Sequence, residues 1–135
     1  MARWDSFVID STTSHIVAAT TNCTSCTWPH GVVYNMTASR SLNFTGQEDD
    51  VAIPGAAFTG LVVGDQVCLS ASLFRICSNE SEFYALVEGA WDRPNIFGVM
   101  PPSLETGPNF IKDLAEQGMI EEQVATININ PYTGN

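Results

Sequence analysis

The sequence FVIDSTTSHIVAATTNC, residues 7–23, joins two apolar runs through a short polar segment. Both runs contain β-branched residues, which predicts two strands. The first run ends at Asp10, and residues 11–14 are all Ser or Thr. Hydroxyl-rich segments after a strand form tight turns, in which hydroxyl and amide groups donate hydrogen bonds to a carboxylate. The stretch therefore predicts a strand–turn–strand unit that presents Asp10 as a candidate functional group.

The composition predicts one folded domain over residues 1–135. Hydrophobic residues make up 44% of the chain and its mean hydropathy is +0.05, which is typical of a globular protein. The 15 acidic and 5 basic side chains give a net charge of −10, which repels phosphate and argues against nucleic-acid binding. No apolar run approaches the ~20 residues of a membrane span. The start, MARWDSFVID, lacks the long apolar core of a secretory signal, so we expect no signal peptide in this chain.

Short apolar runs separated by turn-forming residues continue along the rest of the chain. This rhythm predicts a mainly β fold, either a sandwich or a barrel. The polar, acidic run at residues 47–50 is expected in a loop or at a hairpin tip. The run TININ at residues 126–130 predicts a last strand.

One segment, residues 109–118 (NFIKDLAEQG), has a helical rather than a strand period. Phe110, Ile111 and Leu114 share one face of a helix, and Gly118 suits the position just after its end. We therefore expect one short helix here.

The segment around Asp10 and several later segments, in their order along the chain, resemble the amino-terminal lobe of pepsin-like aspartic peptidases. That family carries Asp-Thr/Ser-Gly-Ser/Thr-Ser after an apolar run, and this chain has DSTTS at residues 10–14. The resemblance covers residues 7–130 and implies a single pepsin-like lobe with the acid-protease fold. It also implies that Asp10 is the catalytic carboxylate, supported by Ser11, Thr12 and Thr13. The later segments that resemble the family are CTSCTWPHGVVY, YNMTASRSL, GLVVGDQVCL, WDRPNIFGVMPPSL and FIKDLAEQGMIEEQVATININ.

Several positions depart from the family pattern. Thr12 stands where the family has glycine, Ile53 where it has the flap tyrosine, and Val17 where it has the supporting tryptophan. In a shifted register Phe58 lies near the flap tip instead, so Ile53 and Phe58 are the candidate flap residues for substrate. Thr12 is β-branched and disfavours the backbone angles that glycine permits, which argues against catalysis by this turn.

A lone carboxylate is insufficient for the chemistry of this family. Its reaction uses water held between two aspartates that share one proton, and this chain offers only Asp10. We therefore expect a half-length, catalytically impaired homologue that acts as a binding or structural subunit of a larger assembly, with a protein or peptide partner. The alternative is an acid aspartic endopeptidase in which Asp10 faces the aspartate of a second lobe or of a second copy. Exposed strand edges also favour a partner chain. Neither hypothesis requires a metal or another cofactor.

The four cysteines allow two interpretations. The resemblance implies two local disulfides, Cys23–Cys26 and Cys68–Cys77. The alternative is a zinc site formed by Cys23, Cys26 and His30 with Cys68 or Cys77. We favour disulfides because four N-glycosylation sequons also indicate the secretory pathway, with an extracellular or lysosome/vacuole-like destination. The sequon asparagines are Asn22, Asn35, Asn43 and Asn79.

Other polar groups are weaker candidates. His15 follows the Asp10 segment, and we expect a hydrogen-bonding structural role for it rather than catalysis. The spacing of Ser11, His15 and Asp65 does not support a catalytic triad. We expect the acidic run at residues 48–50 (Glu48, Asp49 and Asp50) to be solvated rather than to bind a cation.

Overall fold

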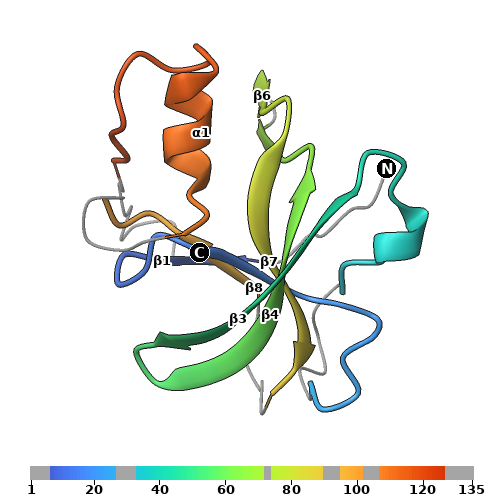
Figure 1. The fold of residues 1–135 in the computed structure, drawn as a ribbon. Helices are drawn as coiled ribbons and strands as arrows, with labels where there is room; N and C mark the ends of the chain where they lie inside the picture. The colour runs from blue at the N-terminus through green and yellow to red at the C-terminus, as the bar shows by residue number, and fades with distance from the viewer. Residues whose placement is uncertain (1–6, 27–32, 72–73, 90–94, 102–106, 127–135) are drawn as a thin grey trace.

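The computed structural model describes residues 7–26, 33–71, 74–89, 95–101 and 107–126. This part of the chain contains eight strands, one short 3-10 helix and one α-helix, so the fold is mainly β, as predicted (Figure 1). None of its helices has the length and apolar character needed to cross a membrane. The elements are β1 (Phe7–Asp10), β2 (Ile16–Ala19), η1 (Met36–Ala38), β3 (Asn43–Ile53), β4 (Ala56–Asp65), β5 (Cys68–Ala71), β6 (Phe74–Cys77), β7 (Ser81–Glu88), β8 (Asn95–Gly98) and α1 (Phe110–Glu116).

Six of these strands form one mixed sheet in the order β1-β8-β2-β7-β4-β3. β8 lies between β1 and β2, parallel to β1 and antiparallel to β2. β1 and β2 follow each other closely in sequence, but the strand between them comes from much later in the chain. The turn at residues 11–15 therefore passes over the end of β8 and connects strands that are not hydrogen-bonded to each other.

Both faces of this sheet are covered. Side chains alternate between the two faces along β2 and β7, which gives each face its own apolar core. On one face Ile16 and Phe83 pack with Phe110 and Leu114 of α1. On the other face the β3–β4 hairpin contributes its own side chains. This second core contains Val17, Ala19, Cys23, Ile53, Phe58, Val62, Tyr84, Leu86 and Ile96.

The predicted helix is confirmed as α1. Its first turn is capped by Asn109, whose side-chain oxygen accepts a hydrogen bond from the backbone N–H of Lys112 at 2.9 Å. At the other end Gly118 has a φ of +75°, and Met119 N donates to Leu114 O at 2.8 Å. This is the hydrogen-bond pattern that a glycine after a helix permits.

The expectation for residues 47–50 was wrong, because these residues lie inside strand β3. The hairpin tip is at Pro54 and Gly55, where Gly55 has a φ of +81°. β3 is the last strand of the sheet and most of its side chains are exposed, so a polar run there meets water without a burial cost. The strand expected at residues 126–130 lies almost entirely outside the described residues.

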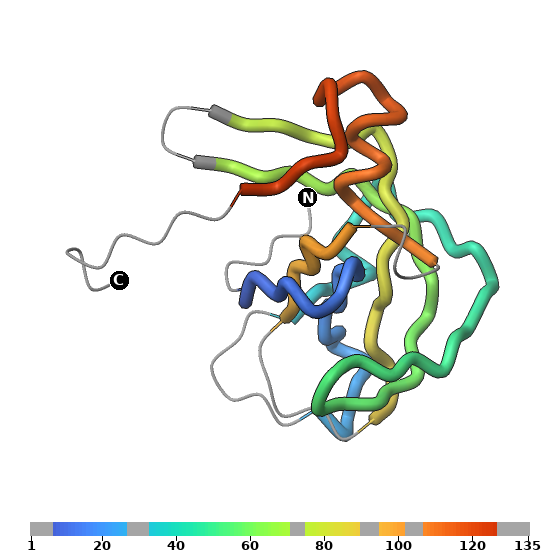
Figure 2. The backbone as a smooth tube through the Cα atoms, turned by 90° about the vertical axis from the view of Figure 1, so that its left-hand side faces the viewer, coloured from blue at the N-terminus to red at the C-terminus, as the bar shows by residue number. Residues whose placement is uncertain are grey.

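Both expected disulfides, Cys23–Cys26 and Cys68–Cys77, are present. All four cysteine sulfurs are therefore in S–S bonds and are not thiolate ligands for the alternative zinc site. His30 lies outside the described residues. The second disulfide joins β5 to β6, which form a separate two-stranded antiparallel sheet. Figure 2 shows this hairpin extending away from the six-stranded sheet.

Candidate functional site

Asp10 is the last residue of β1 and begins the turn that leads to β2. Its Oδ1 accepts two hydrogen bonds from Thr12, one from the backbone N–H at 2.7 Å and one from the hydroxyl at 2.5 Å. Asp10 is half-buried, whereas Ser11 and Thr12 are exposed. The turn therefore holds a carboxylate in a defined orientation at the protein surface.

Thr12 stands where the family has glycine, but its φ is not positive. No non-glycine residue in the described part of the chain has a positive φ, so Thr12 does not adopt the left-handed backbone that favours glycine. Its N–H still reaches the Asp10 carboxylate, and its hydroxyl adds a second donor. A side chain that bonds to the backbone two residues later forms a turn with ordinary dihedral angles, which is why threonine is accepted here.

The end of β8 fixes the position of this turn. Val99 N donates to Asp10 O at 3.0 Å, and Gly98 N donates to His15 O at 2.9 Å, so one short segment bonds to both ends of the turn. A Cβ at Gly98 would lie 2.5 Å from Thr13 O and 2.6 Å from both the N and the O of His15. These are backbone atoms that have no room to move, so the crossing requires glycine at position 98.

Buried polar contacts support the turn from below. His15 is buried, its Nδ1 lies 3.0 Å from Pro108 O, and its ring packs edge-on against Tyr84 at a centroid distance of 5.1 Å. The Tyr84 hydroxyl donates to Asp49 Oδ2 at 3.2 Å. The hydrogen-bonding role expected for His15 agrees with this environment. Tyr84 was not among the predicted site residues, although a tyrosine within an apolar strand signals a hydroxyl that needs a partner.

A second buried network surrounds Asp65 at the end of β4. Its carboxylate accepts hydrogen bonds from the hydroxyls of Tyr34, Ser39 and Ser41 and from the backbone N–H of Gln66. Burial alone would raise the pKa of Asp65, but these donors favour the carboxylate more strongly, so its pKa is lowered. Burial, together with the adjacent Asp65 carboxylate, raises the pKa of Tyr34. The network fastens the segment around η1 to the sheet.

The structure does not assemble Ser11, His15 and Asp65 into a catalytic group. Ser11 is exposed at the tip of the turn, and the Nδ1 of His15 faces the carbonyl of Pro108. The Asp65 carboxylate is surrounded by the three hydroxyls of its own network. His15 and Asp65 therefore have structural partners of their own, and Ser11 faces solvent.

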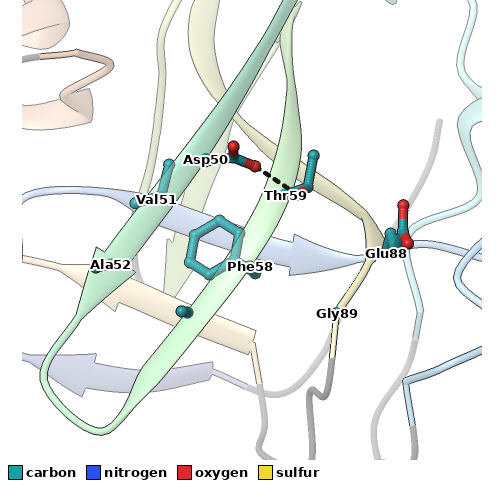
Figure 3. Close-up of a pocket in the computed structure, with 8 residues that line it drawn as sticks. Asp50, Val51, Ala52, Phe58, Thr59, Glu88 and Gly89 are labelled. Atoms are coloured by element: carbon teal, nitrogen blue, oxygen red, sulfur yellow. Dashed lines mark hydrogen bonds between the residues drawn. The ribbon is translucent and has the colours of Figure 1, made fainter.

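An open hollow of about 430 Å³ lies beside the β3–β4 hairpin, where the end of β7 meets it (Figure 3). Asp50, Thr59 and Glu88 are neighbours across β3, β4 and β7, and the Thr59 hydroxyl donates to Asp50 Oδ1 at 2.7 Å. Asp10 does not line this hollow. The residues that line the hollow are Asp50, Val51, Ala52, Ala57, Phe58, Thr59, Glu88 and Gly89.

The two candidate flap residues flank the tip of this hairpin. Ile53 and Phe58 are 6% and 5% exposed, and both pack in the second core of the sheet. Phe58 also lines the hollow, whereas Ile53 does not. Their buried side chains fasten the hairpin to the sheet, and neither carries a hydroxyl toward Asp10.

The acidic side chains of β3 take part in hydrogen bonds within their own strand and with neighbouring strands. The Gln47 side-chain amide donates to both carboxylate oxygens of Asp49 at 3.0 Å, and Glu48 is exposed. The described ranges contain no group of three or more His, Cys, Asp or Glu side chains placed to hold a metal ion.

All four sequon asparagines are exposed and accessible to a glycan: Asn22, Asn35, Asn43 and Asn79.

The most distinctive chemical feature of the described residues is the partly exposed carboxylate of Asp10. Thr12 orients this carboxylate, and the turn that carries it depends on Gly98 at the end of β8. No protein-family model matches this sequence. A comparison with curated proteins likewise finds no match.

Proposed function

We propose that this chain is a single pepsin-like lobe, catalytically impaired, that acts as a binding or structural subunit of a larger assembly. The observation that carries the proposal is the Asp10 turn, in which β8 lies between the two strands that the turn connects. This arrangement supports the resemblance of the Asp10 segment to the aspartate-bearing segment of pepsin-like lobes. No hydrogen bond joins Asp10 to another carboxylate in the described part of the chain, so the pair of aspartates needed for peptide hydrolysis is incomplete.

The β3–β4 hairpin supports the same proposal. It occupies the position in the chain order where the family has its flap, and its tip carries Pro54 and Gly55. The side chains on either side of the tip, Ile53 and Phe58, are apolar and buried. A flap of this kind can cover a bound segment but has no hydroxyl to orient substrate or water.

Acid digestion of an unfolded protein tests the proposal directly. The purified chain is incubated with the substrate between about pH 3 and pH 5, where aspartate dyads share one proton. We expect no cleavage, and we expect Asp10→Asn to be indistinguishable from the unaltered chain. Cleavage that a pepstatin-type inhibitor blocks, and that Asp10→Asn abolishes, would overturn the proposal.

That outcome would instead establish the second candidate function, an acid aspartic endopeptidase formed when Asp10 meets a second aspartate. The observation that favours this candidate is the geometry of the turn: Asp10 is partly exposed, and Thr12 orients its Oδ1 with two donors and no backbone strain. Activity that appears only when a second lobe or a second copy is bound would distinguish it from contamination by another peptidase.

We also propose that the chain folds in the secretory pathway. The two disulfides require an oxidising compartment, and the four exposed sequons are available to the glycosylation machinery. When the chain is secreted from eukaryotic cells behind an added signal peptide, treatment with a glycosidase that removes N-linked glycans should reveal a loss of mass. A chain that is secreted without any such loss would contradict the glycan assignment.

A further inference from the structure

The four N-glycosylation sequons place their hydroxyl residues differently. A sequon requires Ser or Thr two positions after the asparagine, so the glycosylating enzyme has to reach that hydroxyl as well as the asparagine amide. In three sequons this residue is exposed: Thr24, Thr37 and Thr45. In the fourth, which starts at Asn79, the residue is Ser81, and it is only 1% exposed. The Asn79 sequon therefore presents its asparagine to solvent but not its hydroxyl.

The helix α1 and the residue that follows it hold all three residues of the Asn79 sequon. The Ser81 hydroxyl donates to Oδ2 of Asp113, which lies in α1. Gln117 is the C-cap residue of α1, and its Oε1 accepts from Asn79 N at 2.6 Å. The Nε2 of Gln117 donates to Glu80 O at 2.7 Å. An enzyme therefore cannot engage this sequon while α1 is in place.

Apolar burial fixes α1 against β7 in addition to these hydrogen bonds. Phe110 and Leu114 of α1 are buried and belong to the same core cluster as Phe83 of β7. A helix that is anchored by its apolar face leaves the sheet only in rare local opening events. The Asn79 sequon is consequently closed for most of the lifetime of the folded chain.

The Asn35 sequon has the opposite arrangement. Asn35 is the N-cap of η1, and its Oδ1 accepts hydrogen bonds from the N–H and the hydroxyl of Thr37, at 3.1 Å and 2.7 Å. Both residues are exposed, so the amide and the hydroxyl of this sequon lie together at the surface. An enzyme reaches both groups without displacing α1.

The order of synthesis leaves the Asn79 sequon open before α1 closes it. Asp113 lies 32 residues after Ser81, so the helix that buries the hydroxyl is made later than the sequon. Chains are elongated at roughly 5–20 residues per second, which leaves the sequon uncovered for about 2–6 s. The side chain of Asn79 itself is exposed in the folded protein, so α1 has room to dock beside a glycan that is already attached.

We propose that Asn79 accepts an N-linked glycan only before α1 docks on β7, and that docking then closes the site, whereas Asn35 remains an acceptor in the folded chain. This inference rests on the proposed folding in the secretory pathway and adds the time at which each site is modified. The glycan donor is a lipid-linked oligosaccharyl pyrophosphate. The bond from its anomeric carbon to the pyrophosphate breaks, and the pyrophosphate leaves with the electron pair. The Asn79 Nδ2 forms the new bond to that carbon and releases one proton.

Glycan transfer to the folded chain tests this proposal. The chain is produced without glycans and with both disulfides formed, and is then mixed with an oligosaccharyltransferase and its lipid-linked donor. Mass spectrometry of the digested product measures the rate of transfer to each asparagine. We expect transfer to Asn79 to be at least about tenfold slower than transfer to Asn35, because the Asn79 sequon becomes accessible only when α1 opens.

A double variant of α1 tests whether the hydrogen bonds to the sequon keep it closed. Asp113→Ala combined with Gln117→Ala removes all three bonds and leaves the apolar face of α1 unchanged. Transfer to Asn79 in the folded variant should rise by about tenfold, because opening then breaks fewer bonds. Lys112→Ala is the matched control, since the Lys112 side chain is 49% exposed on the same helix. It should leave the rate at Asn79 unchanged.

A second double variant, Phe110→Asp with Leu114→Asp, prevents α1 from docking. Transfer to Asn79 should then come within about threefold of transfer to Asn35, whether opening is confined to α1 or involves the whole chain. The proposal is overturned if Asn79 stays unmodified in this variant, if the folded unaltered chain accepts glycans equally at Asn79 and Asn35, or if folded Asn35 accepts none. Secretion without N-glycans would instead contradict the proposed folding in the secretory pathway, while the transfer rates measured on the purified chain would still decide this inference.

Discussion

Asp65 is a buried carboxylate whose protonation state affects the stability of this chain. Its buried carboxylate accepts hydrogen bonds from three hydroxyls and one backbone N–H, and its pKa is lowered. A carboxyl whose folded pKa lies below its unfolded value, about 3.9, stabilises the protein above that value. This contribution is lost as the pH falls through the folded pKa. The Asp65 network therefore stabilises the fold at neutral pH and weakens in strong acid.

We predict that Asp65→Asn lowers the free energy of unfolding by about 2–4 kcal/mol at neutral pH, because three hydroxyl donors lose their charged acceptor. The difference between the variant and the unaltered chain should shrink in strong acid, as the pH falls through the lowered pKa of Asp65. Urea unfolding at a series of pH values measures both effects. Asp50→Asn is the control, since Asp50 is exposed and its one side-chain bond to Thr59 should be worth less than about 1 kcal/mol.

At this scale the sequence predicted the position of Asp10 but not its surroundings. The pattern of an apolar run followed by hydroxyl residues correctly indicated a strand ending in a turn. It did not indicate that Thr12 would supply both donors, since that depends on the backbone angles of the turn. Nor could spacing show that His15 and Tyr84 touch, because their contact arises from the pairing of β2 with β7.

Among the elements, the passage of β8 between β1 and β2 depends on Gly98. We predict that Gly98→Ala costs at least about 3 kcal/mol or prevents folding, because its Cβ would meet three backbone atoms at 2.5–2.6 Å. Gly46→Ala is the matched control: Gly46 has a φ of +78° but an added Cβ would meet nothing within 4 Å. The control should lose only about 1–2 kcal/mol. Equal losses in thermal unfolding would show that the crossing is not tightly packed.

The β5–β6 hairpin should be the element that depends most on a covalent bond. Isolated two-stranded hairpins are marginal, and Cys68–Cys77 closes this one. We predict that replacing both cysteines with serine opens the hairpin locally at a cost of about 2–3 kcal/mol. Trypsin cleavage after Arg75 should then accelerate by about tenfold or more. Replacing Cys23 and Cys26 instead should leave that cleavage rate unchanged, and equal acceleration would indicate global rather than local opening.

Sequence patterns predicted some elements better than others for a physical reason. α1 was predictable because its apolar period, its cap Asn109 and its terminal Gly118 all lie within one short segment. β3 was misjudged at residues 47–50 because an exposed edge strand need not carry apolar side chains. Local sequence therefore identifies an element whose own apolar residues are buried. It fails for an exposed strand such as β3, which is held in place by pairing with its neighbour.

For the whole molecule, the mainly β character followed from the density of short apolar runs, but the strand order did not. β8 forms bonds with two strands that precede it by most of the chain, and β2 pairs in parallel with β7. Such long-range pairings are selected by packing on both faces of the sheet, which no local window contains. The fold class was thus accessible from the sequence, whereas the arrangement around Asp10 required the structure.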